Sequence, residues 1–181
     1  MTGWVARWMT AGALATALLL GSDPAPGAAG SRGVRIGSPA PELTGGPWIN
    51  SAPQSLPGLR GRVVLVEFWT YGCANCQNVI PQLRTWHERY AKAGLSIVGV
   101  HTPEFLWERP YDRVVAAVRE RGIRYAVVQD NDAAVWTRYG TWAWPTVVLV
   151  DKRGVVRYQH IGEGAYAETE AMITTLLAEG G

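Results

Sequence analysis

The chain has 181 residues, a formal net charge of +2 and a sequence isoelectric point of about 8.7. Hydrophobic residues make up 48% and charged residues 18%, which is ordinary for a globular protein with one buried core. The charge is mild and no lysine and arginine cluster accompanies it, so these features argue against a nucleic-acid-binding protein and we expect no nucleic-acid partner.

The first 33 residues differ from the rest of the chain. Arg7 precedes an apolar run over residues 8–20, and small residues and prolines dominate residues 21–33. This order is typical of a secretory signal peptide, and the run is shorter than the roughly 20 residues that a membrane-spanning helix needs. We predict a signal peptide and flexible leader over residues 1–33, with cleavage near Ala28 or Ala29.

Two alternatives remain for this leader: a membrane anchor retained through residues 8–20, or a disordered leader with no targeting function. Engagement of the export machinery, or anchoring, would place residues 34–181 outside the cytoplasm, as a periplasmic or secreted domain. Disulfides form and persist in such compartments.

Residues 34–62 are dense in Pro, Gly and Ser and predict a loosely structured segment with a short hairpin around Gly45 and Gly46. The apolar pattern then predicts, in chain order, a strand over 63–69, a helix from the cysteines to near Gly94, a strand over 95–100, a helix over 112–121, a strand over 125–129, a short helix capped by 130–132, strands over 146–150 and 155–160, and a helix over 166–178. The order is a βαβ unit and a ββα unit with a helix and strand inserted. Because the strand over 63–69 lacks alternation, we expect an α/β fold with a mixed central sheet and helices on both faces.

Cys73 and Cys76 are the only cysteines, so they must react with each other or with an outside partner. Two thiols cannot build a disulfide scaffold, and they cannot fill a tetrahedral zinc site without distant histidines. Redox chemistry is therefore the leading interpretation, with two inert buried thiols as the alternative. At the start of the predicted helix, free backbone N–H groups and the helix dipole favour a thiolate at Cys73. We predict that Cys73 is the nucleophile, that Cys76 resolves the mixed disulfide, and that no cofactor is required.

Glu67 lies in the apolar strand six residues before Cys73. Burying an ionised carboxylate is costly, so its pKa should rise, and we predict that it relays protons to Cys76. A solvent-facing glutamate on an edge strand is the alternative.

The pattern Glu67-x-Trp69-x-x-x-Cys73-x-x-Cys76, with Pro81 five residues later and Trp144-Pro145 before a strand hairpin, resembles the thioredoxin superfamily. The likeness covers most of residues 34–181. The inserted elements resemble the exported TlpA-like branch, and residues 99–105 and 162–164 resemble the thioredoxin-like domain of DipZ-type proteins.

This resemblance implies a thioredoxin-like fold and a thiol-disulfide oxidoreductase. It would act on exported protein disulfides, in cytochrome c maturation or disulfide repair, with a membrane electron donor. Glu67 would occupy the position of the buried acid in thioredoxins.

The resemblance also implies that the Trp144-Pro145 bond is cis and presents the Trp144 backbone to a substrate strand; without it, Pro145 reads as a strand-entry proline. Ala74 and Asn75 replace the Gly-Pro of many reductants, which leaves the direction of electron flow open. Gly72 replaces a larger residue of many relatives and predicts a more open approach to Cys73.

Other residues have two readings each. Trp69, Tyr71, Trp142 and Trp144 form either an aromatic rim for a polypeptide substrate or packing. His101 ends a parallel strand, and the carboxyl ends of such strands meet at the ligand crevice, so we expect His101 and Glu104 near the cysteines. His101 would then support the site, or it would be a loop histidine without a catalytic role.

Two other functions compete. Thr70-x-x-Cys73 echoes the Thr-x-x-Cys motif of peroxiredoxins, although Val66 stands where that motif has proline. Copper could be bound by Cys73, Cys76 and a histidine such as His101 or His160. Methionine is scarce and the cysteine spacing is one residue narrower than in related copper chaperones, so copper ranks last and we expect no metal.

Overall fold

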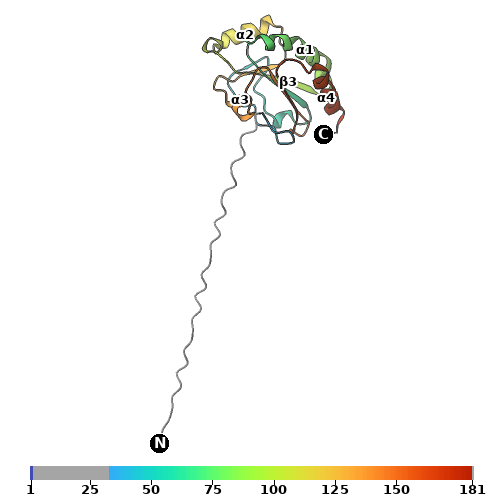
Figure 1. Cartoon of the computed structure of the whole chain (residues 1–181). Helices are drawn as coiled ribbons and strands as arrows, with labels where there is room; N and C mark the ends of the chain where they lie inside the picture. The colour runs from blue at the N-terminus through green and yellow to red at the C-terminus, as the bar shows by residue number, and fades with distance from the viewer. Residues whose placement is uncertain (2–32, 181) are drawn as a thin grey trace.

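A computed structural model describes Met1 and residues 33–180, which form an α/β fold built on one six-stranded sheet (Figure 1). The strands are β1 (Trp48–Ile49), β2 (Val63–Trp69), β3 (Leu95–His101), β4 (Ala126–Gln129), β5 (Thr146–Val150) and β6 (Val156–Ile161). The helices are α1 (Ala74–Tyr90), α2 (Tyr111–Glu120), α3 (Ala134–Arg138) and α4 (Tyr166–Ala178), with short 3₁₀ helices η1 (Pro57–Leu59), η2 (Ala91–Ala93) and η3 (Leu106–Glu108).

The sheet is mixed, as predicted, with the strand order β1-β4-β3-β2-β5-β6. β2, β3 and β4 run parallel, whereas the pairs β1–β4, β2–β5 and β5–β6 are antiparallel. Every residue of β2 is buried, because one face of the sheet packs against α1, α2 and α4 and the other packs against α3 and the N-terminal segment. Figure 1 shows α1, α2 and α4 on one side of the sheet and α3 on the other. The continuous apolar run of β2 therefore indicated its burial correctly.

The hairpin expected around Gly45 and Gly46 is wrong. Gly46 instead donates its N–H to the carbonyl of Gln129 at 2.8 Å, and the following two-residue strand β1 pairs antiparallel with β4. A Cβ on Gly46 would lie 2.8 Å from the Gln129 carbonyl oxygen, so the glycine allows the segment to run close against the edge of the sheet.

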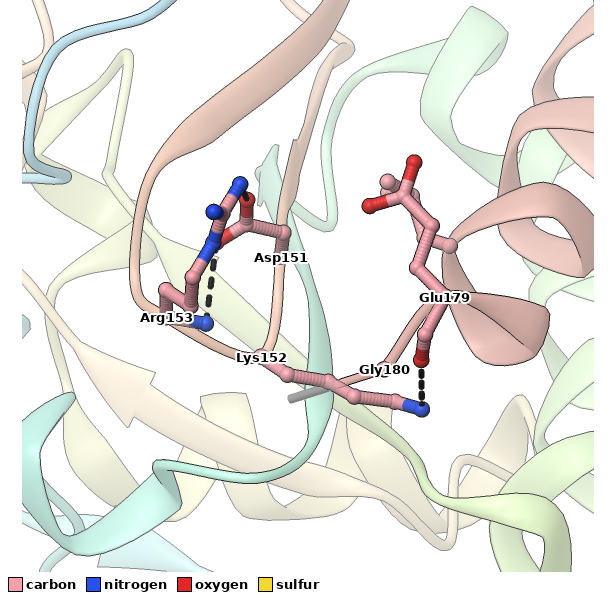
Figure 2. A pocket seen from close by; sticks show the side chains of 6 residues that line it. Asp151, Lys152, Arg153, Glu179 and Gly180 are labelled. Atoms are coloured by element: carbon pink, nitrogen blue, oxygen red, sulfur yellow. Dashed lines mark hydrogen bonds and ion pairs between the residues drawn. The ribbon is translucent and has the colours of Figure 1, made fainter.

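The C-terminal end of the domain is held at the end of the sheet that lies away from the cysteines. There the turn between β5 and β6 meets the end of α4 (Figure 2). Lys152 Nζ donates to the carbonyls of Leu177 at 2.9 Å and Glu179 at 2.6 Å. These bonds satisfy carbonyl groups that a helix end leaves without partners. The small depression between them has no room for a water molecule, so this corner is structural.

Of the predicted leader over residues 1–33, residues 2–32 lie outside the residues that the structure describes, so its cleavage and its anchoring stay predictions. Within residues 33–180, none of the helices combines the length and apolar character needed to cross a bilayer.

Asp130 connects α3 to the region around the cysteines. Its carboxylate accepts the N–H groups of Val135 at 3.0 Å and Trp136 at 2.9 Å, in agreement with the predicted capping role of residues 130–132. It also accepts the hydroxyl of Thr102 at 3.1 Å. The Thr102 carbonyl in turn accepts the indole N–H of Trp144 at 3.1 Å, so one buried carboxylate links α3 to the loop before β5.

Replacing Asp130 with alanine should lower the free energy of unfolding by about 2–3 kcal/mol, because three buried donors lose a charged acceptor. Asp132→Ala is the matched control, since Asp132 is exposed and its replacement should change stability by less than about 0.5 kcal/mol. Urea unfolding followed by tryptophan fluorescence measures both, and equal stability of the two variants would contradict the capping role.

Candidate active site

The two cysteines occupy different environments at the start of α1. Cys73 is the N-cap residue, with extended backbone, and its Sγ accepts the N–H of Cys76 at 3.2 Å. Cys73 is half-buried, whereas Cys76 is fully buried. Burial, followed by its hydrogen bond with Cys73, raises the pKa of the Cys76 thiol. This asymmetry places a reachable sulfur in front of a protected one, as the roles of nucleophile and resolving thiol require.

Glu67 lies inside the sheet, not on an edge. It faces the α1 side of β2 between Leu65 and Trp69, in the layer that contains Cys76, and its side chain is fully buried. Burial raises its pKa from 4.5 to about 8, although a hydrogen bond from the Tyr125 hydroxyl at 3.1 Å opposes the shift. Only Oε2 receives that bond, and Oε1 has no partner. The site thus holds a carboxyl group that exchanges its proton near neutral pH.

An open cleft of about 500 Å³ borders Cys73. Its walls come from three parts of the chain: the start of α1 with the residue before it, the loop after β3, and the loop before β5. The lining residues are Gly72, Cys73, Ala74, Asn75, Glu104, Trp142, Ala143 and Trp144. The cleft is wide and open, so it suits a polypeptide segment better than an enclosed small molecule.

Trp144 forms one wall of this cleft, and the peptide bond between Trp144 and Pro145 is cis, as the resemblance implied. The indole of Trp144 packs on Trp136 of α3, with ring centroids 4.2 Å apart. Pro145 is buried and lies outside the cleft lining, so its part in substrate binding stays a prediction. Glu104 does reach the cysteine side of the cleft, as its position after β3 predicted.

Of the two interpretations of Trp69, packing is correct and a place in a substrate rim is wrong. Its side chain is fully buried in the core under α1, with its edge against the imidazole of His101 at 5.1 Å between ring centroids. β2 has both faces covered, so an aromatic residue at its end packs inward. Tyr71 is half-buried and lies outside the lining of the Cys73 cleft. Its hydroxyl donates to the Trp107 carbonyl at 2.7 Å, which makes it a support of the site.

His101 is fully buried at the end of β3 and contacts the segment before Cys73. Its Nε2 lies 3.4 Å from both the Thr70 hydroxyl and the Tyr71 N–H, and its ring stacks on Tyr71. Burial lowers the pKa of His101 from 6.5 to about 4, so the ring is neutral at physiological pH and accepts the Tyr71 N–H. His101 therefore supports the cysteine loop and does not line the cleft.

Gly72 lines the open cleft beside Cys73, and the more open approach expected from it stays a prediction. A Cβ at this position would meet the carboxylate of Glu108 and would lie 2.7 Å from the Trp107 ring, so the space beside Gly72 is filled. Glu108 and Tyr125 are the residues of the site that sequence reasoning missed. The one available signal for Glu108 was an acidic residue directly after three large apolar residues, Phe105, Leu106 and Trp107.

Within residues 33–180, no group of three or more histidine, cysteine, aspartate and glutamate residues has the geometry to hold a metal ion. The copper site that combined both cysteines with a histidine therefore has no counterpart in the described part of the chain. His101 is turned toward Thr70 and Tyr71 instead.

The fold and the paired cysteines define a thioredoxin superfamily protein of the TlpA-like type, as the sequence resemblance indicated. The crystal structure of the thioredoxin-like superfamily protein SPOA0173 is similar, with a TM-score of 0.74 and 28% sequence identity, over 78% of this chain and 97% of that one. The model of the AhpC/TSA family matches residues 36–159. The chain belongs to the AhpC/TSA family.

Two curated relatives are informative. Protein DipZ of Mycobacterium tuberculosis is 42% identical over 142 residues, which is 76% of this chain and 20% of that protein. The thiol-disulfide oxidoreductase ResA of Geobacillus thermodenitrificans is 28% identical over 124 residues, or 68% of each chain. The chain thus spans about a fifth of the length of DipZ.

The raised pKa of Glu67 predicts how stability depends on pH. Native Glu67 holds its proton up to about pH 8, whereas the unfolded chain releases it near 4.5, so the native state loses stability as pH rises through this window. The upper limit of the slope is about 1.4 kcal/mol per pH unit.

Glu67→Gln keeps an acceptor for Tyr125 and cannot ionise, so it should become increasingly more stable than wild type between pH 5 and about pH 8. Urea unfolding of both reduced proteins at several pH values measures the difference. Subtracting one from the other removes the opposite slope that neutral, buried His101 contributes below pH 6.5. A constant difference across the window would contradict a buried, protonated Glu67.

Proposed function

We propose that this protein reduces disulfides in exported protein substrates through a dithiol-disulfide cycle of Cys73 and Cys76. The observation that carries the proposal is the pairing of a half-buried Cys73 at the N-cap of α1 with a fully buried Cys76 one turn later, beside an open cleft. The relationship to proteins named thiol-disulfide oxidoreductase supports the same activity.

In the first step, the Cys73 thiolate attacks one sulfur of the substrate disulfide. A bond forms between Cys73 and that sulfur, the substrate S–S bond breaks, and the other substrate sulfur leaves as a thiolate. The N–H of Cys76, 3.2 Å from the Cys73 sulfur, stabilises the attacking anion before the bond forms. The start of α1 adds its other free N–H groups and its positive end.

In the second step, Cys76 loses its proton and attacks the Cys73 sulfur, releasing the second substrate sulfur as a thiolate. Two electrons have then passed to the substrate, and the enzyme holds a Cys73–Cys76 disulfide. Burial opposes ionisation of Cys76, so a nearby proton acceptor is needed. Glu67 fits this role, since its unpartnered Oε1 lies in the same buried layer and its pKa of about 8 is near the working pH.

The cycle must be completed by an outside dithiol that reduces the Cys73–Cys76 disulfide. The pattern of residues 1–33 supports export, so we place the enzyme outside the cytoplasm and assign the electrons to a membrane donor. Apocytochromes c awaiting haem attachment and misoxidised exported proteins are the proposed substrates. The open cleft beside Cys73 has room for the polypeptide segment around a substrate disulfide.

Cys76→Ala should abolish catalytic turnover and should accumulate mixed disulfides with protein substrates through Cys73. Without the resolving thiol, the first step proceeds and the second cannot. The measurement is reduction of insulin for activity, and non-reducing electrophoresis with mass spectrometry of the adducts. Cys73→Ala is the control and should form no adduct, because buried Cys76 is out of reach of a protein.

Two outcomes would replace this proposal. Rapid peroxide consumption without protein adducts would favour a peroxidase, and the AhpC/TSA family also includes peroxidases. Against this function, Thr70 of the Thr-x-x-Cys motif is fully buried beside His101. A reduction potential well above about −180 mV, measured against glutathione, would assign the enzyme to disulfide formation or isomerisation.

A further inference from the structure

The two backbone amides just before Cys73 are held by the last residue of β3 and by the segment that follows it. The N–H of Tyr71 points to His101 Nε2 at 3.4 Å, and the N–H of Gly72 donates to Glu108 Oε1 at 2.9 Å. Cys73 adds a local turn, with its N–H donating to the Thr70 carbonyl at 3.3 Å. The position of the nucleophile therefore depends on residues that lie 30 and 36 positions along the chain from the amides that they hold.

Glu108 is the centre of this arrangement. Its side chain is fully buried, and its second oxygen, Oε2, accepts the N–H groups of Glu104 at 2.6 Å and Phe105 at 2.9 Å. One carboxylate thus uses one oxygen for the residue before Cys73 and the other for the loop after β3. Charge-assisted bonds of this kind are strong and directional, so they fix the distance between the two segments.

These two segments are neighbouring parts of the lining of the active-site cleft, because both donate to the same carboxylate. Gly72 and Glu104 both line it, whereas Glu108 does not. Gly72 does not have a positive φ, so the absence of a side chain there serves space: a Cβ would press on the Glu108 carboxylate and on Trp107. Gly72 can approach Glu108 closely because it has no side chain, and the Glu108 carboxylate holds it there by accepting its N–H.

We propose that Glu108 is a positioning residue that sets the spacing of Gly72 and Glu104 in the cleft lining, and so determines how well a protein substrate binds beside Cys73. The inference takes its substrate from the proposed function and rests on it. Glu108 acts through these two lining segments and lies outside the cleft lining itself. Its loss therefore affects recognition of an extended substrate more than the intrinsic reactivity of Cys73.

Glu108→Gln tests this with little change in volume. A glutamine has one acceptor oxygen and an NH₂ donor. Either the N–H of Gly72 or the N–H groups of Glu104 and Phe105 must then face this NH₂ donor and lose their acceptor. Amide hydrogen exchange at Gly72, or at Glu104 and Phe105, should become roughly tenfold faster, the loss expected for one charge-assisted bond. The KM for insulin should rise several-fold with kcat within about twofold, and alkylation of Cys73 by iodoacetamide should stay within about twofold of wild type.

Glu88→Gln is the matched control, because it removes the same charge from an exposed position on α1 and should leave all three readouts unchanged. Gly72→Ala disturbs the same contact from the other side without removing the carboxylate, and it should reproduce the rise in KM. It also provides the test if Glu108→Gln does not fold.

Unchanged amide exchange, an unchanged KM in both variants, or a fall in iodoacetamide reactivity in step with the loss of insulin turnover would overturn the proposal. If wild-type protein does not reduce insulin, the proposed function fails by itself. Amide exchange and alkylation of Glu108→Gln then still decide the inference: faster exchange with unchanged alkylation supports it, and unchanged exchange overturns it.

Discussion

The chemistry of this site depends on where β2 stops and α1 starts. The strand is buried on both faces and ends at Trp69, and the chain then makes one turn before Cys73 caps the helix. That turn brings one sulfur to the surface and leaves Cys76 in the core. A shift of one residue in the helix start would rotate both cysteines by about 100° around the helix axis and so change both environments. The hydrogen bonds that fix the turn are therefore part of the catalytic apparatus.

Those hydrogen bonds come from the end of β3 and from the inserted segment that follows it. His101 and Glu108 hold the amides of Tyr71 and Gly72, and Arg121 donates to the Tyr71 carbonyl at 3.1 Å. On the other side of the cleft, Asp130 and Thr102 hold α3 and Trp144. Both walls thus converge on residues 101–108, which run from the last residue of β3 to the end of η3. A rigid sheet positions these loops, and the loops carry the chemistry.

The sequence predicted the features that local signals encode. The apolar run of β2, the cysteine spacing and the period of α1 are all visible within a few residues, and they located Glu67, Cys73 and Cys76 correctly in the fold. Features that depend on long-range contacts were missed. The two-residue strand β1 carries no periodic signal, Trp69 looked like a rim residue because nothing local shows which way a strand end faces, and Glu108 acquires its partner 36 residues away at Gly72.

Glu67 and Glu108 show how the same side chain acquires different roles within one site. Both are fully buried, so each ionised form must be compensated by hydrogen bonds. Glu108 receives three backbone N–H groups across its two oxygens, from segments that cannot easily move away, and its carboxylate serves as a fixed support. Glu67 receives only the Tyr125 hydroxyl and keeps Oε1 without a partner, so burial raises its pKa and the proton becomes exchangeable. The number of donors around each carboxyl, more than its depth, separates the residue that holds the cleft from the residue that moves a proton.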